Sequence, residues 1–274
     1  MLFLKTLSKI IAPHLSRFQK TQGRSCHSVF DFKELLQHEK PDQFTVHPLT
    51  SEHHQMALDA IKRHYLSEHV LVRARKMDLN DRALDEYLVS LMKQGNSLYA
   101  KAEDDAVAGV CVNFASSQVD PRNLRVYAQY RQDPNIKDFL CFTAKLQETP
   151  NLWEAFKQTK IFEIKMLTVL PEYRRQGLAV TLTERSKELA IDLGYKVIRM
   201  DCINPYDYKV AERCMLHCIV KFPLHKLRGP HAPYIKRSSE LNQCVRVYVE
   251  ARAQIDAPDQ TKLGNKLELE SLIE

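Results

Sequence analysis

The sequence predicts an α/β fold with a mixed, twisted sheet of six to seven strands flanked by about four helices. From Gln43 to Val249 the apolar residues alternate between a spacing of about two, typical of strands, and a spacing of about 3.6, typical of helices. With 274 residues, of which 44% are hydrophobic and 27% charged, the chain can bury one full core. We therefore expect one domain over residues 43–252, with extra segments at both ends.

The first half of this domain is predicted to contain three strands and two helices. Thr50 or Ser51 can cap the first helix and Asn80 or Asp81 the second, because their side chains can accept hydrogen bonds from the first free amides. A loop that carries Glu68 separates the two helices. In chain order the predicted elements are the strand Gln43–Pro48, a helix from Thr50 to about Tyr65, a helix from Asp81 to Lys93, and a hairpin of Leu98–Glu103 with Ala106–Ala115.

The second half begins with residues 120–160, which are charged and too long for a loop. Helices are predicted there over about 135–145 and 152–158. Strands and helices then alternate up to residue 251. The remaining predicted elements are the strand Phe162–Leu170, the helix Gln176–Leu193, the strand Lys196–Cys202, the helix Asp207–His217, and the strands Ile219–Leu224 and Cys244–Ala251.

The charge distribution argues against nucleic-acid binding. The net charge is +6, but the first 30 residues contain five Lys and Arg and no acidic residue, so the rest of the chain is close to neutral. A phosphate backbone requires a clustered basic face, and no dense run of basic residues follows residue 30. The polar segment 253–274 is expected to be a tail.

Residues 1–30 form a basic, amphipathic leader. Its composition is typical of a mitochondrial transit segment, although a disordered tail or a helix on a membrane surface would have the same pattern. Seven cysteines in a chain of this length favour a reducing compartment, and no apolar run approaches the roughly 20 residues that span a bilayer. We expect an intracellular protein, located in the cytoplasm or, if residues 1–30 are a transit peptide, in the mitochondrial matrix.

The segment Arg174–Ala179 has the form R-x-x-G-x-A and joins a predicted strand to a predicted helix. A helix N-terminus presents unpaired N–H groups and a partial positive charge, which together attract anions. Gly177 would let a phosphate approach the backbone, because glycine has no Cβ. The plain alternative is a tight turn at Gly177 with two solvated arginines.

This segment lies within Leu167–Gly194, which resembles the acetyl-CoA-binding motif of the GNAT superfamily, and the order of elements is similar over about Phe44–Arg252. The run from Tyr173 to Glu184 is most similar to the insect arylalkylamine N-acetyltransferases. The resemblance implies a GNAT fold, splayed between the strands ending at Pro171 and at Cys202 to admit acetyl-CoA as cosubstrate. It also implies acetyl transfer to a small primary amine by direct attack.

The resemblance further implies roles for individual residues. Glu68 stands where the insect enzymes carry a glutamate that acts as general base through water, and its alternative role is to pair with a surface cation; His69 is a second possible base. Asn204 would cap the following helix and point toward the coenzyme. Backbone groups of Leu167, Thr168 and Val169 would hold the pantetheine arm, and those of Arg174, Arg175, Gln176, Gly177, Leu178 and Ala179 the pyrophosphate.

The chain departs from the family where the insect enzymes place serines, because Ile203 and Asp207 occupy those positions. Tyr206 and Tyr208 are the hydroxyls left as proton sources, and the position of a tyrosine found in many GNAT enzymes is Ala211. Two alternatives therefore stay open: an acyltransferase with another donor or acceptor, of glycine or polyamine type, and a non-catalytic GNAT-like CoA-binding module.

For the acceptor, Asp207 could attract a cationic amine, and Phe139, Phe142 and Trp153 could line an arylalkyl pocket. No metal is expected, since Cys214, His217 and Cys218 lack a fourth ligand at a recognised spacing. The sequence does not predict the oligomeric state.

Overall fold

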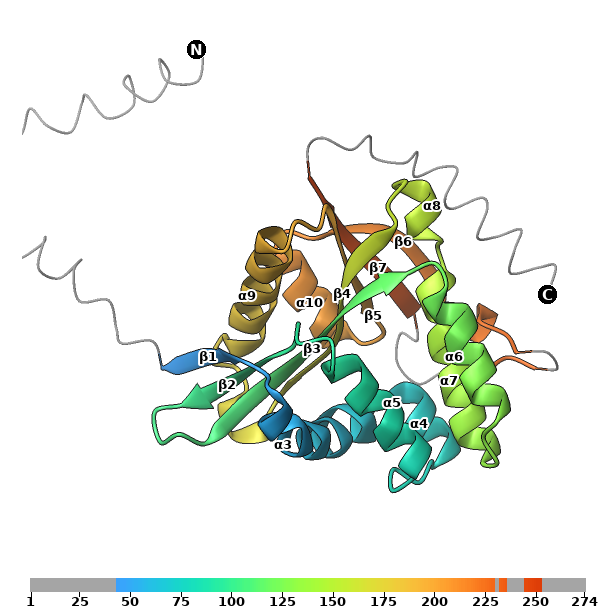
Figure 1. Cartoon of the computed structure of the whole chain (residues 1–274), viewed down its shortest axis with the longest axis horizontal. Helices are drawn as coiled ribbons and strands as arrows, with labels where there is room; N and C mark the ends of the chain where they lie inside the picture. Colours follow the sequence, from blue (N-terminus) through green and yellow to red (C-terminus); the bar gives the residue numbers. More distant parts are fainter. Residues whose placement is uncertain (1–42, 230–231, 236–243, 253–274) are drawn as a thin grey trace, which may run out of the picture. The chain divides into compact units, whose positions relative to one another are not determined.

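A computed structural model describes residues 43–229, 232–235 and 244–252 (Figure 1). The expectations for the leader, residues 1–30, and for the tail, residues 253–274, lie outside the described residues. Among the helices that the structure does describe, none has the length and apolar character required to cross a membrane.

Seven strands form one mixed sheet in the order β1-β2-β3-β4-β5-β7-β6, which confirms the predicted α/β fold (Figure 1). Neighbouring strands are antiparallel except β4 and β5, which are parallel. The strands are β1 (Phe44–Pro48), β2 (Leu98–Ala102), β3 (Val107–Ser117), β4 (Lys160–Val169), β5 (Val197–Cys202), β6 (His217–Pro223) and β7 (Cys244–Ala251).

The sheet splays between β4 and β5. Their pairing covers only three residues of each strand and stops at Ile164 with Met200, whereas β3 pairs with β4 as far as Val169. The last five residues of β4 therefore have a partner strand on one edge only, among the described residues. This is the splay that the family resemblance implied between these two strands.

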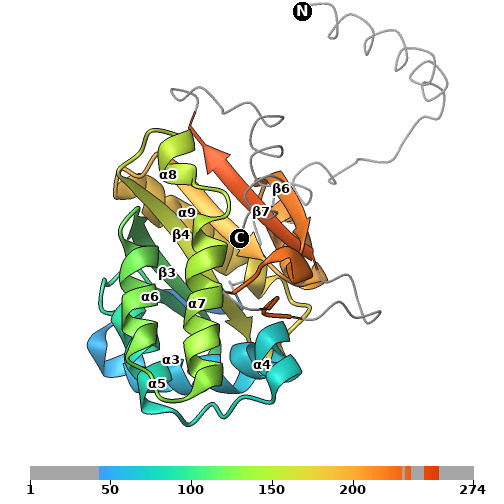
Figure 2. The same cartoon turned by 90° about the vertical axis from the view of Figure 1, so that its right-hand side faces the viewer.

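Helices cover both faces of the sheet. On one face lie α9 (Leu178–Asp192) and α10 (Pro205–Arg213). On the other face α6 and α7 run side by side (Figure 2). The helices of that second face are α3 (His54–Ala60), α4 (Val70–Arg75), α5 (Arg82–Met92), α6 (Asp120–Gln129), α7 (Pro134–Glu148) and α8 (Leu152–Ala155).

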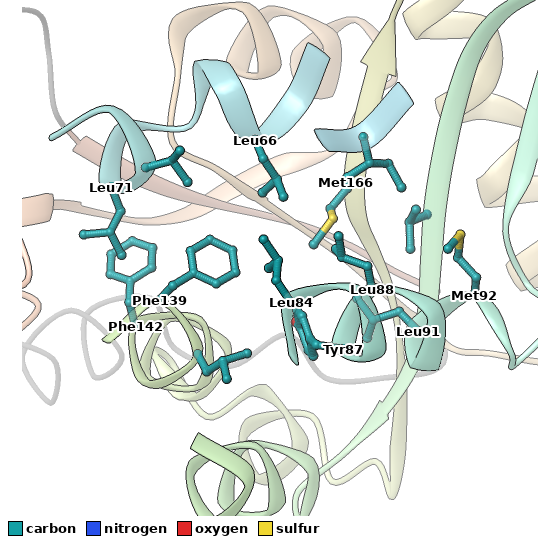
Figure 3. Close-up of a cluster of buried hydrophobic side chains, with 14 of the residues drawn as sticks. Leu66, Leu71, Leu84, Tyr87, Leu88, Leu91, Met92, Phe139, Phe142 and Met166 are labelled. Atoms are coloured by element: carbon teal, nitrogen blue, oxygen red, sulfur yellow. The ribbon is translucent and has the colours of Figure 1, made fainter. Parts of the chain in front are cut away.

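Each face has its own hydrophobic core. Leu178, Leu182 and Ala190 of α9 pack against the sheet on the first face. On the second face side chains from α4, α5, α7 and β4 meet in one larger cluster, and Phe139 and Phe142 lie at its α7 end (Figure 3). The splay between β4 and β5 is thus enclosed by helices on both sides.

The predicted helix from Thr50 to Tyr65 is divided into three short pieces, and a fourth short piece follows it. Thr50 does not cap it, because its hydroxyl bonds to the His53 ring instead. The backbone passes through a 3₁₀ turn (Ser51–His53), α3, the π-helical turn η3 (Ile61–Tyr65) and the 3₁₀ turn η4 (Leu66–Glu68). Glu68 therefore lies on a 3₁₀ turn rather than in an open loop. The turn before it, η3, is π-helical, and single π-turns are frequent at functional sites.

Other predicted boundaries change for local reasons. Asp81 caps α5 as expected, with its carboxylate accepting from the amides of Ala83 and Leu84. The helix predicted from Gln176 begins at Leu178, because Arg175 and Gly177 have positive φ. α10 begins at Pro205 rather than Asp207, since proline is favoured in a first helical turn. The sequence did not predict α4 or α6.

Candidate active site

The loop Arg174–Ala179, called the amide loop below, leaves a run of backbone amides without acceptors. Left-handed backbone at Arg175 (φ 65°) and Gly177 (φ 87°) turns the chain sharply into α9. Among the described residues, the first amide of α9 with an acceptor is that of Val180, which bonds to the Gly177 carbonyl at 2.9 Å. The amides from Arg175 to Ala179 are thus free to bind an anion, and the helix N-terminus adds a partial positive charge.

Two glycines shape the space around this loop. A Cβ placed on Gly177 would meet no atom within 4 Å, so the backbone there faces open space. By contrast, a Cβ on Gly109 would lie 3.0 Å from the Thr168 carbonyl and 3.1 Å from Leu182, so its absence lets α9 pack closely on β3. The backbone at Gly177 is therefore open to a ligand, whereas the backbone at Gly109 is in close contact with α9 and β4.

The free edge of β4 presents alternate backbone groups to the splay. The amide of Leu170 donates to the carbonyl of Ala108 in β3. Antiparallel partners alternate between bonded and non-bonded pairs, so Thr168 also bonds toward β3, while Leu167 and Val169 point toward the splay. The backbone of Thr168 is therefore already paired, which leaves Leu167 and Val169 for a pantetheine arm.

Arg174 connects the amide loop to η4. Its Nε donates to the Val169 carbonyl, and its Nη2 forms an ion pair with the Glu68 carboxylate, both at 3.0 Å. The Glu68 side chain is 63% exposed. The structure thus brings Glu68 to the mouth of the splay. Its pairing with Arg174 is the kind of contact with a surface cation that we gave as the alternative role of Glu68. The side chains of Arg175 and Gln176 lie at the surface.

At the end of β5, Asn204 organises the first turn of α10. Its Oδ1 accepts from the amides of Tyr206 (2.9 Å) and Asp207 (3.0 Å), which is the predicted cap. Its Nδ2 donates to the Asp207 carboxylate. Burial raises the pKa of Asp207 to about 7, and Glu68 adds to that rise although the Asn204 hydrogen bond opposes it. Asp207 is therefore a carboxyl group poised to titrate near neutral pH.

The two tyrosines proposed as proton sources face other directions. Tyr206 is 79% exposed. Tyr208 is buried, its hydroxyl donates to the Cys244 carbonyl, and the Arg246 guanidinium lies 4.2 Å from its ring centroid. These contacts favour a structural role for Tyr208 against β7.

A pocket opens from the splay on the side of η3 and α7. Its wall is aromatic, with Tyr65, Phe139 and Phe142, so two of the aromatics expected there do line it. Trp153 does not; it is buried elsewhere, and its indole N–H donates to the Ser116 carbonyl at 3.1 Å. An aromatic wall of this kind suits a flat apolar group.

His69 also lines the pocket but is a poor candidate for a base. Its Nδ1 accepts from the Leu71 amide at 3.2 Å and so caps α4. The ring is 8% exposed, and burial lowers its pKa to about 4. His69 is consequently a neutral capping residue near pH 7.

Four charged residues from two strands form the charged floor of this pocket: Glu163 and Lys165 of β4, and Arg199 and Asp201 of β5. Glu163 accepts from Ser116 (2.6 Å), Gln147 (2.9 Å) and Lys165 (3.0 Å). Burial opposes its ionisation, but Lys165 and Arg199 still hold the pKa of Glu163 below its ordinary value. The charges of the floor are therefore paired within the protein.

Arg199 ties the floor to the C-terminus of α7. It is 1% exposed and its Nε donates to Asp201 at 2.8 Å. Its two Nη atoms donate to backbone carbonyls at the end of α7 and just after it, which belong to Leu146, Gln147, Thr149 and Pro150. Sequence reasoning missed this floor, although charged residues at i and i+2 in two apolar strands were a visible signal.

Comparisons with known proteins give one matching family model and several structures with a similar fold. A family model described as "Acetyltransferase (GNAT) family" matches residues 58–214. The structure of a mosquito arylalkylamine N-acetyltransferase like 5b is 19% identical, with a TM-score of 0.70, and the match covers 76% of this chain and 100% of that one.

Two further solved structures are similar over the same region. Arylalkylamine N-acetyltransferase 2 from Aedes aegypti is 20% identical (TM-score 0.68), with 77% of this chain and 99% of that one covered. A polyamine N-acetyltransferase of Drosophila melanogaster, which forms N-acetylagmatine, is 16% identical (TM-score 0.69), with 76% and 100% covered. At these identities the likenesses concern the fold.

Proposed function

The chain belongs to the acetyltransferase (GNAT) family, and from that premise we propose that it transfers the acetyl group of acetyl-CoA to a small primary amine. The observation that carries this proposal is the run of free amides in the amide loop, next to a sheet splayed between β4 and β5. The amides from Arg175 to Ala179 would hold the diphosphate, and Leu167 and Val169 the pantetheine arm. The amide of Arg174, which the sequence also suggested for the diphosphate, already donates to the Pro171 carbonyl. Acetyl-CoA supplies an activated acyl group as a thioester.

The acceptor amine would enter from the pocket on the opposite side of the sheet from α9. The aromatic wall of Tyr65, Phe139 and Phe142 supports an aryl group on the amine. Asp207, which interacts electrostatically with Tyr65 of this wall, would attract the cationic amine before it reacts. An arylalkylamine meets both requirements, and agmatine or a polyamine meets only the second.

An amine arrives as an ammonium ion and has to lose a proton before it can attack a thioester. Glu68, at the mouth of the splay, would remove this proton through water. Its ion pair with Arg174 would direct the carboxylate toward the amide loop. Positioning of the amine against the thioester supplies much of the remaining acceleration.

The test is calorimetric titration of the purified chain with CoA and acetyl-CoA, followed by a thiol-release assay over arylalkylamines, agmatine, polyamines and glycine. We expect acetyl-CoA binding and turnover, with arylalkylamines preferred. Glu68→Gln should lower kcat/KM for the amine about 100-fold near neutral pH, with recovery at higher pH where solution already deprotonates the amine. Glu172→Gln, an exposed glutamate on the neighbouring turn η5 (Pro171–Tyr173), is the matched control. Binding without turnover of any amine would leave a CoA-binding module.

A further inference from the structure

Two carboxyl groups face the splay, and their surroundings differ. Glu68 is 63% exposed and forms an ion pair with Arg174. Asp207 is half-buried, and its hydrogen-bond partner is the neutral amide of Asn204. A half-buried carboxyl group whose only hydrogen-bond partner is neutral holds a proton more strongly than it would in water. Asp207 is thus suited to take up a proton and give it back near neutral pH.

Asn204 fixes the orientation of Asp207. Its side chain bonds to two amides of α10 through Oδ1 and to Oδ2 of Asp207 through Nδ2, so three hydrogen bonds hold one amide group. The described residues provide no hydrogen-bond partner for Oδ1, the second oxygen of Asp207. The fixed carboxyl group therefore offers one open oxygen at the end of β5.

The groups around Asp207 come from three elements besides α10. Tyr65 of η3, Glu68 of η4 and Cys202 of β5 each interact electrostatically with it, as does Tyr208 of α10 itself. Of these groups only Glu68 contributes to the raised pKa of Asp207, because its negative charge disfavours a second carboxylate close by. Tyr65 also lines the pocket, so Asp207 lies close to one of the residues of the pocket wall.

We propose that Asp207 is a catalytic proton shuttle, which takes a proton from the attacking amine nitrogen and delivers it to the departing sulfur. Glu68 first converts the ammonium ion to the free amine, and that proton passes to solvent. As the C–N bond forms and the C–S bond breaks, the Asp207 carboxylate accepts one proton from the nitrogen. The resulting carboxylic acid then protonates the CoA thiolate, which leaves Asp207 ionised again. The inference rests on the proposed acetyl transfer.

The experiment compares Asp207→Asn with Glu68→Gln in the full chain. Asp207→Asn keeps a side chain that Asn204 can bond to but cannot carry the proton, so kcat should fall at least about 100-fold at every pH tested. The loss in Glu68→Gln should instead recover at high pH. Asp85→Asn, a first-turn acid of α5 on the other face of the sheet, should change kcat less than about twofold. Calorimetry should show unchanged CoA affinity for both active-site variants.

A second readout does not depend on turnover. In wild-type protein with ¹³C-labelled aspartate, one carboxyl signal absent from the Asp207→Asn spectrum should titrate near pH 7 rather than near 4. A signal that titrates with the ordinary aspartates, or an Asp207→Asn variant that retains wild-type kcat, overturns the proposal. If wild type binds CoA but acetylates no amine, the proposed function fails instead, and the carboxyl titration still reports whether Asp207 is a proton-holding group.

Discussion

The amide loop and the charged floor lie at the same splay but are built in opposite ways. The amide loop is six consecutive residues whose left-handed turn leaves amides free. The charged floor takes its side chains from β4 and β5, and Arg199 ties them to the end of α7 some 50 residues away in the sequence. A ligand site made of consecutive backbone can be recognised in a sequence, whereas one made of paired side chains exists only in the folded chain.

The largest expected effect concerns the charged floor and is structural. Arg199→Met should lower the free energy of unfolding by about 3–5 kcal/mol, because Asp201 loses its buried partner and the backbone carbonyls at and after the end of α7 lose the guanidinium that bonds to them. Urea unfolding measures this loss. Arg185→Met, which breaks an exposed pair with Glu188, should cost less than about 0.5 kcal/mol. Equal losses in the two variants would contradict a structural role for the floor.

The next effect concerns the amide loop and is one of binding. Gly177→Glu should weaken CoA binding at least about 100-fold, or roughly 2.7 kcal/mol, because a carboxylate would repel the diphosphate from the amides. Gly194→Glu is the matched control, since Gly194 also has positive φ (81°, against 87° at Gly177) and open space around its Cβ position. Calorimetry should show weakened CoA binding for Gly177→Glu and unchanged CoA binding for Gly194→Glu, although the two variants should lose similar amounts of stability. Equal CoA affinities would refute the anion site.

A smaller effect is the pH dependence of stability that comes from His69, which lines the pocket. The pKa of His69 is about 4 in the folded protein and 6.5 ordinarily, so between these values the unfolded chain binds a proton that the folded chain does not. Stability should therefore fall as pH is lowered through this window, by about 2–3 kcal/mol from this residue.

His69→Asn isolates that contribution, because asparagine can still accept from the Leu71 amide but does not titrate. Urea unfolding at pH 7 and pH 4.5 should show a shallower loss of stability in this variant. A loss as steep as that of wild type would show that His69 is not the buried neutral group described above.

The smallest effects distinguish the two tyrosines of α10. Tyr208→Phe should cost about 1 kcal/mol of stability, since its hydroxyl bonds to the Cys244 carbonyl, and should change kcat less than about twofold. Tyr206→Phe should change neither stability nor kcat measurably, because the side chain is 79% exposed. A large fall in kcat for either variant, measured by thiol release, would return that tyrosine to the list of proton sources.

Local patterns were sufficient for most of the fold. Alternating apolar residues predicted all seven strands to within about two residues. Where the prediction was wrong, tertiary contacts or backbone strain decided the outcome. The helix from Thr50 to Tyr65 is interrupted because its residues pack against both β4 and α5, and α9 starts late because Arg175 and Gly177 have left-handed backbone.

The candidate site divides in the same way. The family resemblance pointed to Arg174–Ala179 from the sequence alone, and the turn there has the free amides that its role requires. It could not show that Arg174 pairs with Glu68, that Tyr208 turns toward β7, or that Thr168 is already paired with β3. These facts depend on which way a side chain or peptide group points once distant segments are packed together.

The sequence by itself determined the α/β fold, the family and the amide loop, because apolar spacing and a glycine at a strand-to-helix turn act over a few neighbouring residues. Only the tertiary structure decided the charged floor and the surroundings of Asp207. Burial and pairing set the proton affinity of a carboxyl group, and both arise from residues far apart in the chain. Two carboxyl groups therefore have different surroundings. Glu68 is exposed and ion-paired with Arg174, whereas Asp207 is half-buried and has a raised pKa.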